Sequence, residues 1–351
     1  MPLFPEPHPS FPPWSRYLTP LSTVYAALVS SRIALYRNHV LPQVRLSRPV
    51  ISVGNIVLGG TGKTPTIASL ARAIVSSGRF PCLLTRGHGR VDPSRALVSI
   101  GDGAQVSAGR GGDEPVLLAK LVPRLAIISD RRRASAGRWA EEHLRPDVFL
   151  LDDGFQHLPL VRDRDLVLLS SRDPLGGNAL PPRGLLREPP SALARATDVA
   201  VLAAENEDAG ESLDLARRLA PSARHFVARR STTGPFLPNG SPKPVEELSR
   251  LRLLAVSGVA RNSGASEAMR RAGLPIVSTL EFPDHHRYTP DDFDHIGRVL
   301  DREKLDGVIT TGKDGVKFTP DVGFPWWWID VEIEADWAPI LDVLTEWEVQ
   351  A

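Results

Sequence analysis

The sequence predicts an α/β protein with a doubly wound parallel sheet and a second, smaller α/β domain. Three observations support this fold class. Short apolar runs alternate with segments of helical spacing over about 205 residues, and the alternation then restarts. A glycine-rich turn ending in Gly62-Lys63-Thr64 joins the first apolar run to a helical segment. The 351 residues, 42% of them hydrophobic and 24% charged, are enough for two well-packed domains.

Strands and helices alternate regularly in the first half. The expected strands are apolar runs, and they lie in residues 48–56, 81–86, 124–129, 147–153, 165–170 and 198–204. The expected helices have apolar residues at helical spacing, and they cover residues 63–76, 113–122 and 131–144. Strands joined through helices pair in parallel, with helices on both faces of the sheet.

A long loop interrupts the first half, and the second half repeats the alternation after about residue 205. Residues 172–190 are rich in glycine, proline and basic residues, and a loop of this length is typical of a functional or mobile segment. Further strands are expected at 251–260, 273–282 and 305–314, and helices at about 263–272 and 290–302. We therefore expect three parts, namely an apolar and basic N-terminal segment over 1–45, a larger domain over 46–205 and a smaller α/β domain over 206–351.

The N-terminal quarter combines apolar and basic residues and lacks acids. No Asp or Glu lies between Pro7 and Val91. The same stretch contains ten basic residues, which are Arg16, Arg32, Arg37, Arg45, Arg48, Lys63, Arg72, Arg79, Arg86 and Arg90. In a chain of net charge +1 this asymmetry favours an anionic partner, and nucleic acid, a phosphorylated substrate and an anionic lipid surface are all candidates.

Two interpretations of the apolar segment 17–36 stay open. Its uncharged part, residues 17–31, would form a helix of about 22 Å, shorter than the ~30 Å hydrocarbon core of a bilayer. Trp14, Tyr17, Tyr25 and Tyr36 with nearby arginines suit a helix in the membrane interface. A helix packed on the protein core is the alternative. The opening residues are not a secretory signal, and the single cysteine, Cys82, fits a reducing compartment.

The stretch ISVGNIVLGGTGKTPTIASL, residues 51–70, has the context of a phosphate-binding loop. The usual spacing, G-x-x-x-x-G-K-[ST], places a glycine where this chain has Val57, and Gly54 and the Gly59-Gly60 pair are expected to supply the flexibility instead. A phosphate cradle needs inward N–H groups, a helix N-terminus and a lysine. The expected nucleotide-binding residues are Val57, Leu58, Gly59, Gly60, Thr61, Gly62, Lys63 and Thr64.

Carboxylates at the end of a buried strand predict a magnesium site. The apolar run DVFLLDD ends in Asp152-Asp153, and such a pair beside a phosphate loop is the usual second anchor for Mg²⁺. Thr64 is expected to place its hydroxyl on the same ion. Glu114 is a weaker candidate ligand. The alternative is that the strand-end acids only cap a turn.

Two further groups of residues are candidates for proton transfer. Asp113 and Glu114 follow two glycines, which would let a bulky acceptor approach, although two acids before an apolar helix also suit the helix dipole. Asp284 and His285 follow an expected strand, and a histidine beside a carboxylate suits proton transfer. Further ligands at metal spacing are missing nearby in the sequence, which disfavours zinc.

Seven motifs occur in this order, namely VGNIVLGGTGKTP, TRGHG, GDEP, DDGFQH, RGLLREP, FPDHHRYT and TGKDGVKF. Together they resemble one family, the tetraacyldisaccharide 4′-kinases (lipid A 4′-kinases) of Gram-negative bacteria. The resemblance runs from about Leu21 to Phe318. The phosphate loop of that family has the form G-G-x-G-K-T-P without the usual first glycine, so Val57 is what the family would have. His88, where a tyrosine is common, and the additional Arg183 depart from the family pattern and leave the acceptor contacts open.

The resemblance implies a lipid kinase with two α/β/α lobes, the first being a P-loop NTPase-like kinase domain, and a membrane-associated N-terminal helix. It implies transfer of the ATP γ-phosphoryl group to the 4′-hydroxyl of an acylated glucosamine disaccharide 1-phosphate, with ATP as co-substrate and Mg²⁺ as cofactor. The family's catalytic acid falls on Asp113, supported by Asp284 and His285, and its phosphate lysine and magnesium hydroxyl fall on Lys63 and Thr64. The expected location is the cytoplasmic face of the inner membrane.

Two other classes of function remain as alternatives. A membrane-associated P-loop GTPase or ATPase switch would share the loop, but the guanine code [NT]-K-x-D is missing, because Lys313 stands directly before Asp314 in TTGKDG. A nucleic-acid-binding protein would use the basic N-terminus. The basic residues there are scattered among apolar positions rather than clustered with stacking aromatics, so no nucleic-acid partner is expected.

Overall fold

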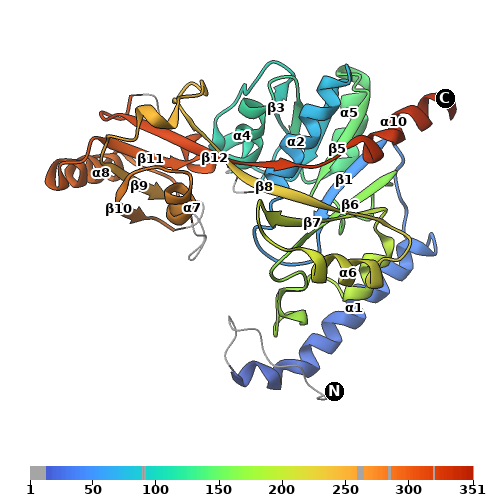
Figure 1. Cartoon of the computed structure of the whole chain (residues 1–351). Helices are drawn as coiled ribbons and strands as arrows, with labels where there is room; N and C mark the ends of the chain where they lie inside the picture. Colours follow the sequence, from blue (N-terminus) through green and yellow to red (C-terminus); the bar gives the residue numbers. More distant parts are fainter. Residues whose placement is uncertain are drawn as a thin grey trace. The chain divides into compact units, whose positions relative to one another are not determined.

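The chain folds into two compact units, each assembled from separate stretches of sequence (Figure 1). The computed structural model describes residues 13–88, 90, 92–258, 265–283, 286–318 and 321–350. Within them, the first unit takes in 13–86, 132–230 and 333–350, and the second takes in 87–131 and 231–332. The domain boundaries expected at 45/46 and 205/206 do not coincide with the boundaries of these units, and they stay a prediction.

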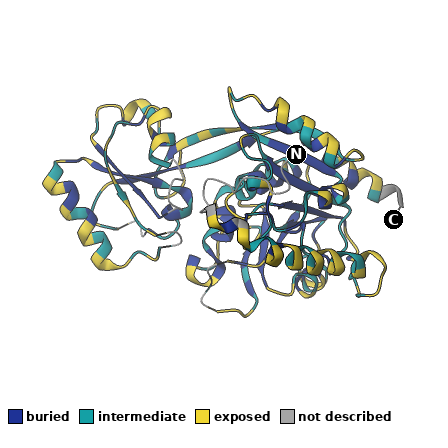
Figure 2. Ribbon diagram, turned by 90° about the horizontal axis from the view of Figure 1, so that it is seen from below, coloured by how far each residue is buried: buried dark blue, intermediate teal, exposed yellow. Residues whose placement is uncertain are grey.

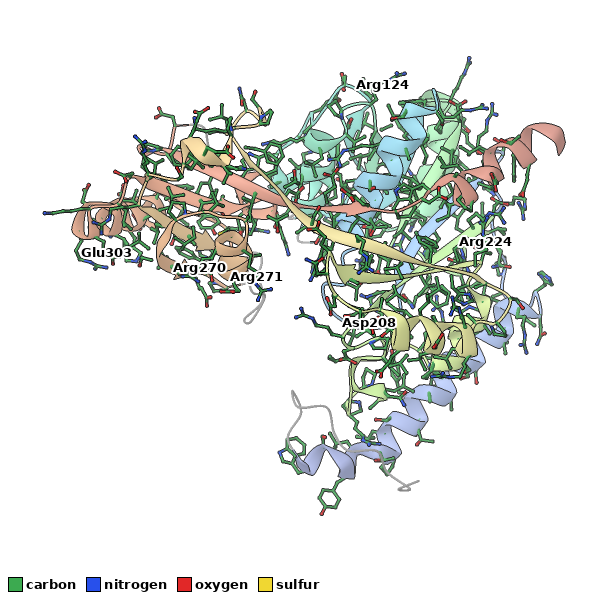
Figure 3. All side chains as sticks on the ribbon, viewed as in Figure 1. Arg124, Asp208, Arg224, Arg270, Arg271 and Glu303 are labelled. Atoms are coloured by element: carbon green, nitrogen blue, oxygen red, sulfur yellow. The ribbon has the colours of Figure 1, made fainter. Side chains whose placement is uncertain are left out.

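A parallel sheet forms the centre of the first unit. Its order is β8 (Arg224–Phe236), β7 (Asp198–Ala204), β6 (Arg164–Ser170), β1 (Val50–Asn55), β5 (Val148–Asp152) and β2 (Pro81–Thr85). All of β1 is buried, as expected for a strand covered on both faces, and Figure 2 shows the strands as mainly buried ribbon. Arg224, labelled in Figure 3, begins β8 and pairs through Nε with Asp198 Oδ1 of β7 at 2.7 Å.

Within the described residues, every α-helix of the first unit except the first in the chain buries apolar side chains. The helices of this unit are α1 (Thr19–Arg37), α2 (Lys63–Ser76), α5 (Arg133–His143), α6 (Gly210–Leu219) and α10 (Ala338–Gln350), with short 3-10 helices at Pro13–Leu18, Gly176–Asn178 and Pro190–Arg195. Helix α2 buries Ile67, Leu70 and Ile74, which recur every three or four residues. The C-terminal segment is held on α2, since Trp337 Nε1 donates to Ser69 Oγ at 2.9 Å.

The second unit has its own parallel strands and an antiparallel pair. The parallel strands are, in order, β10 (Ile276–Glu281), β9 (Leu253–Ser257), β11 (Gly307–Thr311) and β12 (Trp326–Glu334), and the antiparallel pair is β3 (Ala96–Ile100) with β4 (Ala126–Ser129). The helices are α3 (Ala108–Gly111), α4 (Asp113–Leu121), α7 (Ala265–Arg271), α8 (Pro290–Glu303) and α9 (Gly312–Gly315), with a 3-10 turn at Val245–Glu247. Strands β8 and β12 each begin in one unit and end in the other.

The predicted α/β class with its parallel strands is confirmed. Each apolar run predicted as a strand contains one, and each predicted helix is present within a few residues of its expected bounds. The sequence analysis missed strands β3, β8 and β12 and helices α3, α6, α9 and α10. Within the described residues, none of the helices is both long and apolar enough to cross a membrane.

Candidate active site

The phosphate-binding loop joins the central strand to a helix N-terminus. Strand β1 ends at Asn55 and α2 begins at Lys63. Gly59 and Gly62 have φ of +119° and +77°, values that favour glycine. Among the described residues no side chain caps α2, and its first turn contains no acid, so its N–H groups and positive dipole end suit an anion.

Gly54 has a different role from the one expected. It lies inside β1, and a Cβ there would stand 2.7 Å from Cβ of Phe155. Its lack of a side chain therefore lets the loop after β5 approach β1. The positive φ angles are at Gly59 and Gly62, so these two positions give the phosphate loop its shape.

A buried asparagine organises the loop from below. Asn55 is fully buried, and its Nδ2 donates to the Val57 carbonyl at 2.6 Å and to Thr61 Oγ1 at 2.7 Å. Its Oδ1 accepts a hydrogen bond from Lys63 Nζ at 3.3 Å. One side chain thus fixes both the start of the loop and the lysine at its end.

The strand-end carboxylates lie beside the same loop, as predicted. Strand β5 is the parallel neighbour of β1, with Asp152 in register with Val53, so both strands end at the same edge of the sheet. Lys63 Nζ lies 3.4 Å from Asp153 Oδ1, and Asp152 Oδ2 accepts from Thr85 Oγ1 at 2.7 Å. Asp153 has φ of +51°, a conformation that aspartate tolerates better than most residues.

Two cations hold Asp153 ionised. Burial acts to raise its pKa, but the charges of Lys63 and Arg187 outweigh burial and lower the pKa below the ordinary value. Arg187 NH1 lies 2.7 Å from Asp153 Oδ2. Arg187 was not singled out from the sequence, although it belongs to the RGLLREP motif.

The long loop 172–190 is bound to the phosphate loop through backbone hydrogen bonds. The N–H of Leu58 donates to the Leu185 carbonyl at 2.7 Å, and the N–H of Arg187 donates to the Ile56 carbonyl at 2.7 Å. Val57 and Leu186 form an antiparallel bridge between these bonds. The predicted functional loop therefore contributes to the geometry of the phosphate loop itself.

The donor set fits magnesium better than a metal held only by protein. Within the described residues there is no group of three His, Cys, Asp or Glu side chains arranged to hold a metal ion. Magnesium is usually bound by one or two carboxylates, waters and substrate phosphates. Asp152 and Asp153 offer such carboxylates, and Thr64, partly buried in the first turn of α2, offers a hydroxyl oxygen.

Asp113 and Glu114 lie in the second unit, in the first turn of α4. Lys317 Nζ is 3.2 Å from Asp113 Oδ2, and Lys313 Nζ is 4.0 Å from Glu114 Oε1. Gly112 precedes them with φ of +99°, and this backbone conformation by itself explains why the residue is glycine. Asp284 and His285 lie outside the described residues, so the expected pairing of His285 with Asp113 stays a prediction.

His157, in the motif DDGFQH, lies among arginines in the first unit. Burial and then the charges of Arg133, Arg162 and Arg32 lower its pKa to about 3. Its Nδ1 is 2.9 Å from Arg133 NH2. The histidine therefore stays neutral near pH 7, and the guanidinium groups give this part of the unit a positive field.

Helix α1 and the 3-10 helix before it expose an apolar stripe, and other residues of α1 bind the long loop. The exposed side chains recur every three or four positions along one face, and they are Trp14, Tyr17, Leu21, Val24 and Leu28, with exposures between 58% and 71%. Ser22 Oγ donates to the Leu180 carbonyl at 3.0 Å, and Tyr25 OH donates to the Arg187 carbonyl at 3.1 Å. Within the described residues the stripe is exposed rather than packed on the core, and its place in a membrane interface stays a prediction.

Known proteins resemble this chain over most of its length. The family model described as LpxK, tetraacyldisaccharide-1-P 4′-kinase, matches residues 14–347. A tetraacyldisaccharide 4′-kinase of Pelobacter propionicus is 41% identical over 301 residues, covering 86% of this chain and 82% of the relative. A tetraacyldisaccharide 4′-kinase of Geobacter sulfurreducens is 39% identical over 299 residues, covering 85% of this chain and 82% of the relative.

A solved structure agrees with these relatives. The "apo" form of LpxK from Aquifex aeolicus, crystallised in complex with ATP, matches with a TM-score of 0.76 and 28% identity, covering 95% of this chain and 98% of that chain. The family model, the relatives and the fold all point the same way, and the chain belongs to the tetraacyldisaccharide-1-P 4′-kinase family.

Proposed function

We propose that this protein transfers the γ-phosphoryl group of ATP to the 4′-hydroxyl of a tetraacylated glucosamine disaccharide 1-phosphate, a step of lipid A synthesis. The observation that carries the proposal is the phosphate loop. Lys63 stands at the N-terminus of α2, where the loop after strand β1 ends, and Asn55 and Asp153 fix its side chain. Family membership supplies the acceptor, since the relatives are named for a 4′-kinase.

In the first unit, Lys63 and the N–H groups at the start of α2 bind the nucleotide phosphates and stabilise the charge that develops during transfer. Thr64 and Asp152 or Asp153 would hold Mg²⁺, with Glu114 as a weaker candidate. The ion neutralises phosphate charge when bound. Arg187 keeps Asp153 ionised and oriented when Lys63 turns toward a phosphate, because its own ion pair is 2.7 Å long.

In the second unit, Asp113 is the proposed general base. It accepts the proton of the 4′-hydroxyl while the sugar oxygen bonds to the γ-phosphorus, and the bond from that phosphorus to the β,γ-bridging oxygen breaks to release ADP. His285 and Asp284 support Asp113 in this proposal. Their part rests on the family resemblance alone.

We place the protein on the cytoplasmic face of the inner membrane through α1. The acyl chains of the acceptor stay in a bilayer, so the enzyme has to reach them there. The exposed stripe on α1 is apolar, and the surrounding sequence lacks acids from Pro7 to Val91. Such a helix suits the interface of an anionic bilayer.

Acceptor dependence tests the proposed function. We expect purified protein with ATP and Mg²⁺ to release ADP rapidly only when the tetraacyl disaccharide 1-phosphate is present in mixed micelles. The matched control acceptor is the same disaccharide 1-phosphate without acyl chains. Equal ADP release with and without acceptor, or preference for GTP, would instead favour a nucleotide-dependent switch.

A further inference from the structure

The motif TGKDGVKF, residues 311–318, contributes Asp314 and Lys317 to a buried ion cluster in the second unit. Strand β11 ends at Thr311, and the short helix α9 follows it. Asp314 in α9 is fully buried. Its Oδ2 accepts from the N–H of Gly258 at 2.8 Å and from Thr311 Oγ1 at 3.0 Å. This carboxylate is therefore fixed to the ends of β9 and β11.

Lys317 joins this fixed carboxylate to Asp113. Its Nζ lies 3.1 Å from Asp314 Oδ1 and 3.2 Å from Asp113 Oδ2. The exposed fractions of the three side chains are small, 7% for Lys317, 14% for Asp113 and 0% for Asp314. A lysine side chain usually moves freely in solvent, but this ammonium group is held between two carboxylates.

The backbone on both sides of the cluster is fixed by one apolar core. Leu117, one turn after Asp113 on α4, packs in the same cluster as Phe318, the residue after Lys317. Trp326 and Trp328 of β12 belong to that cluster too. Both backbones are therefore anchored, and the Lys317 ammonium group is a fixed neighbour of the Asp113 carboxylate.

We propose that Lys317 is a positioning residue for phosphoryl transfer, because it holds Oδ2 of Asp113 and so orients this carboxylate toward the acceptor hydroxyl. The inference rests on the proposed role of Asp113 as general base. A general base has to lie within hydrogen-bond reach of the proton that it accepts, and a displacement of about 1 Å can lower a rate a hundredfold.

A purely structural role for Lys317 predicts a different outcome. In that case Lys317 only neutralises the buried Asp314, and its removal harms the fold because it leaves a buried charge without its counterion. Removing both charges, in Lys317→Met with Asp314→Asn, restores the charge balance. It does not restore the contact to Asp113. This double variant distinguishes the positioning role of Lys317 from the structural one, even if Lys317→Met alone fails to fold.

The experiment measures kcat, the KM for ATP and the melting temperature in the micelle assay. For the double variant we expect a melting temperature near that of the wild type, an unchanged KM for ATP, and kcat lowered about tenfold to a hundredfold. Lys317→Arg, which keeps a cation beside Asp113, should recover part of kcat. A double variant with wild-type kcat and melting temperature overturns the inference.

Asp113→Asn distinguishes this inference from the proposed function. We expect Asp113→Asn to lose most of kcat. Combining it with Lys317→Met and Asp314→Asn should lower kcat no further, because the effects of mutating residues that act as a unit do not add. Wild-type turnover in Asp113→Asn refutes the base itself. A large loss in Asp113→Asn together with normal turnover in the double variant refutes only the part assigned to Lys317.

Discussion

Replacing Lys63 by alanine tests the phosphate loop most severely. The ammonium group is placed by Asn55 Oδ1 at 3.3 Å and Asp153 Oδ1 at 3.4 Å, and the lysine side chain is only 15% exposed. It is therefore oriented before nucleotide binds. Losing one such fixed stabiliser of transition-state charge typically costs about 3–4 kcal/mol, or 10²–10³ in kcat.

The same contacts predict a small effect on stability. The Asp153 side chain is 40% exposed and keeps its ion pair with Arg187, so removing Lys63 leaves the carboxylate with a partner. Ion pairs with this much exposure contribute about 0.2–1 kcal/mol. The expected signature is thus a nearly inactive enzyme that melts within a few degrees of the wild type.

The assay is ADP release in mixed micelles, combined with a melting curve. Lys243→Ala is the matched control, because Lys243 pairs with Glu247 in the second unit and has no assigned part in the reaction. Full activity in a folded Lys63→Ala protein would show that the loop is not the phosphate site. Equal losses in Lys63→Ala and Lys243→Ala would point to a general effect of removing lysine charge.

Three further predictions follow from the site and the first helix. Asp153→Asn or Asp152→Asn should raise the Mg²⁺ concentration needed for half-maximal activity, and unchanged titrations in both variants would remove these acids from the metal site. Leu28→Glu, in the apolar stripe, should release the protein from anionic vesicles, whereas Thr23→Glu on another side of the helix should not; equal binding of both variants contradicts the membrane role. His157 takes up a proton near pH 6.5 when unfolded but only near pH 3 when folded, so its burial costs stability as pH falls through this window. The melting temperature of His157→Asn should therefore fall less than that of the wild type between pH 7 and pH 4.5. An equal fall in both proteins would refute the assigned pKa.

Local features were predictable from the sequence where one short stretch carries the signal. The strand, turn and helix of the phosphate loop follow from an apolar run, a pair of glycines and a helical pattern that begins at Lys63. Asp152 and Asp153 were predictable because an apolar run ends in two acids. The structure places both beside that loop, because β5 is the parallel neighbour of β1.

Contacts that depend on distant segments were not predictable. Arg187 reaches Asp153 because the long loop pairs with the phosphate loop, and Lys317 reaches Asp113 because α4 and the TGKDGVKF segment share one core. Asn55 had a local signal that was overlooked, namely an amide that ends an otherwise apolar buried strand directly before a glycine-rich turn.

The missed strands have physical reasons of their own. Strand β8 alternates half-buried and exposed residues over much of its length, so it lacks the apolar run that marked the buried strands. Strand β12 opens with three tryptophans and then has an acidic residue at every second position. Both strands begin in one unit and end in the other, whereas the sequence analysis placed each domain in one continuous stretch.

Identifying the reaction product tests the central claim most directly. The wild-type protein is incubated with ATP, Mg²⁺ and tetraacyl disaccharide 1-phosphate, and the lipid product is examined by ³¹P NMR with proton correlation. The account predicts a second phosphate monoester whose phosphorus couples to the proton at C4′, with Lys63→Ala producing almost none. A second phosphate at any other position, or inorganic phosphate as the main product, would contradict it.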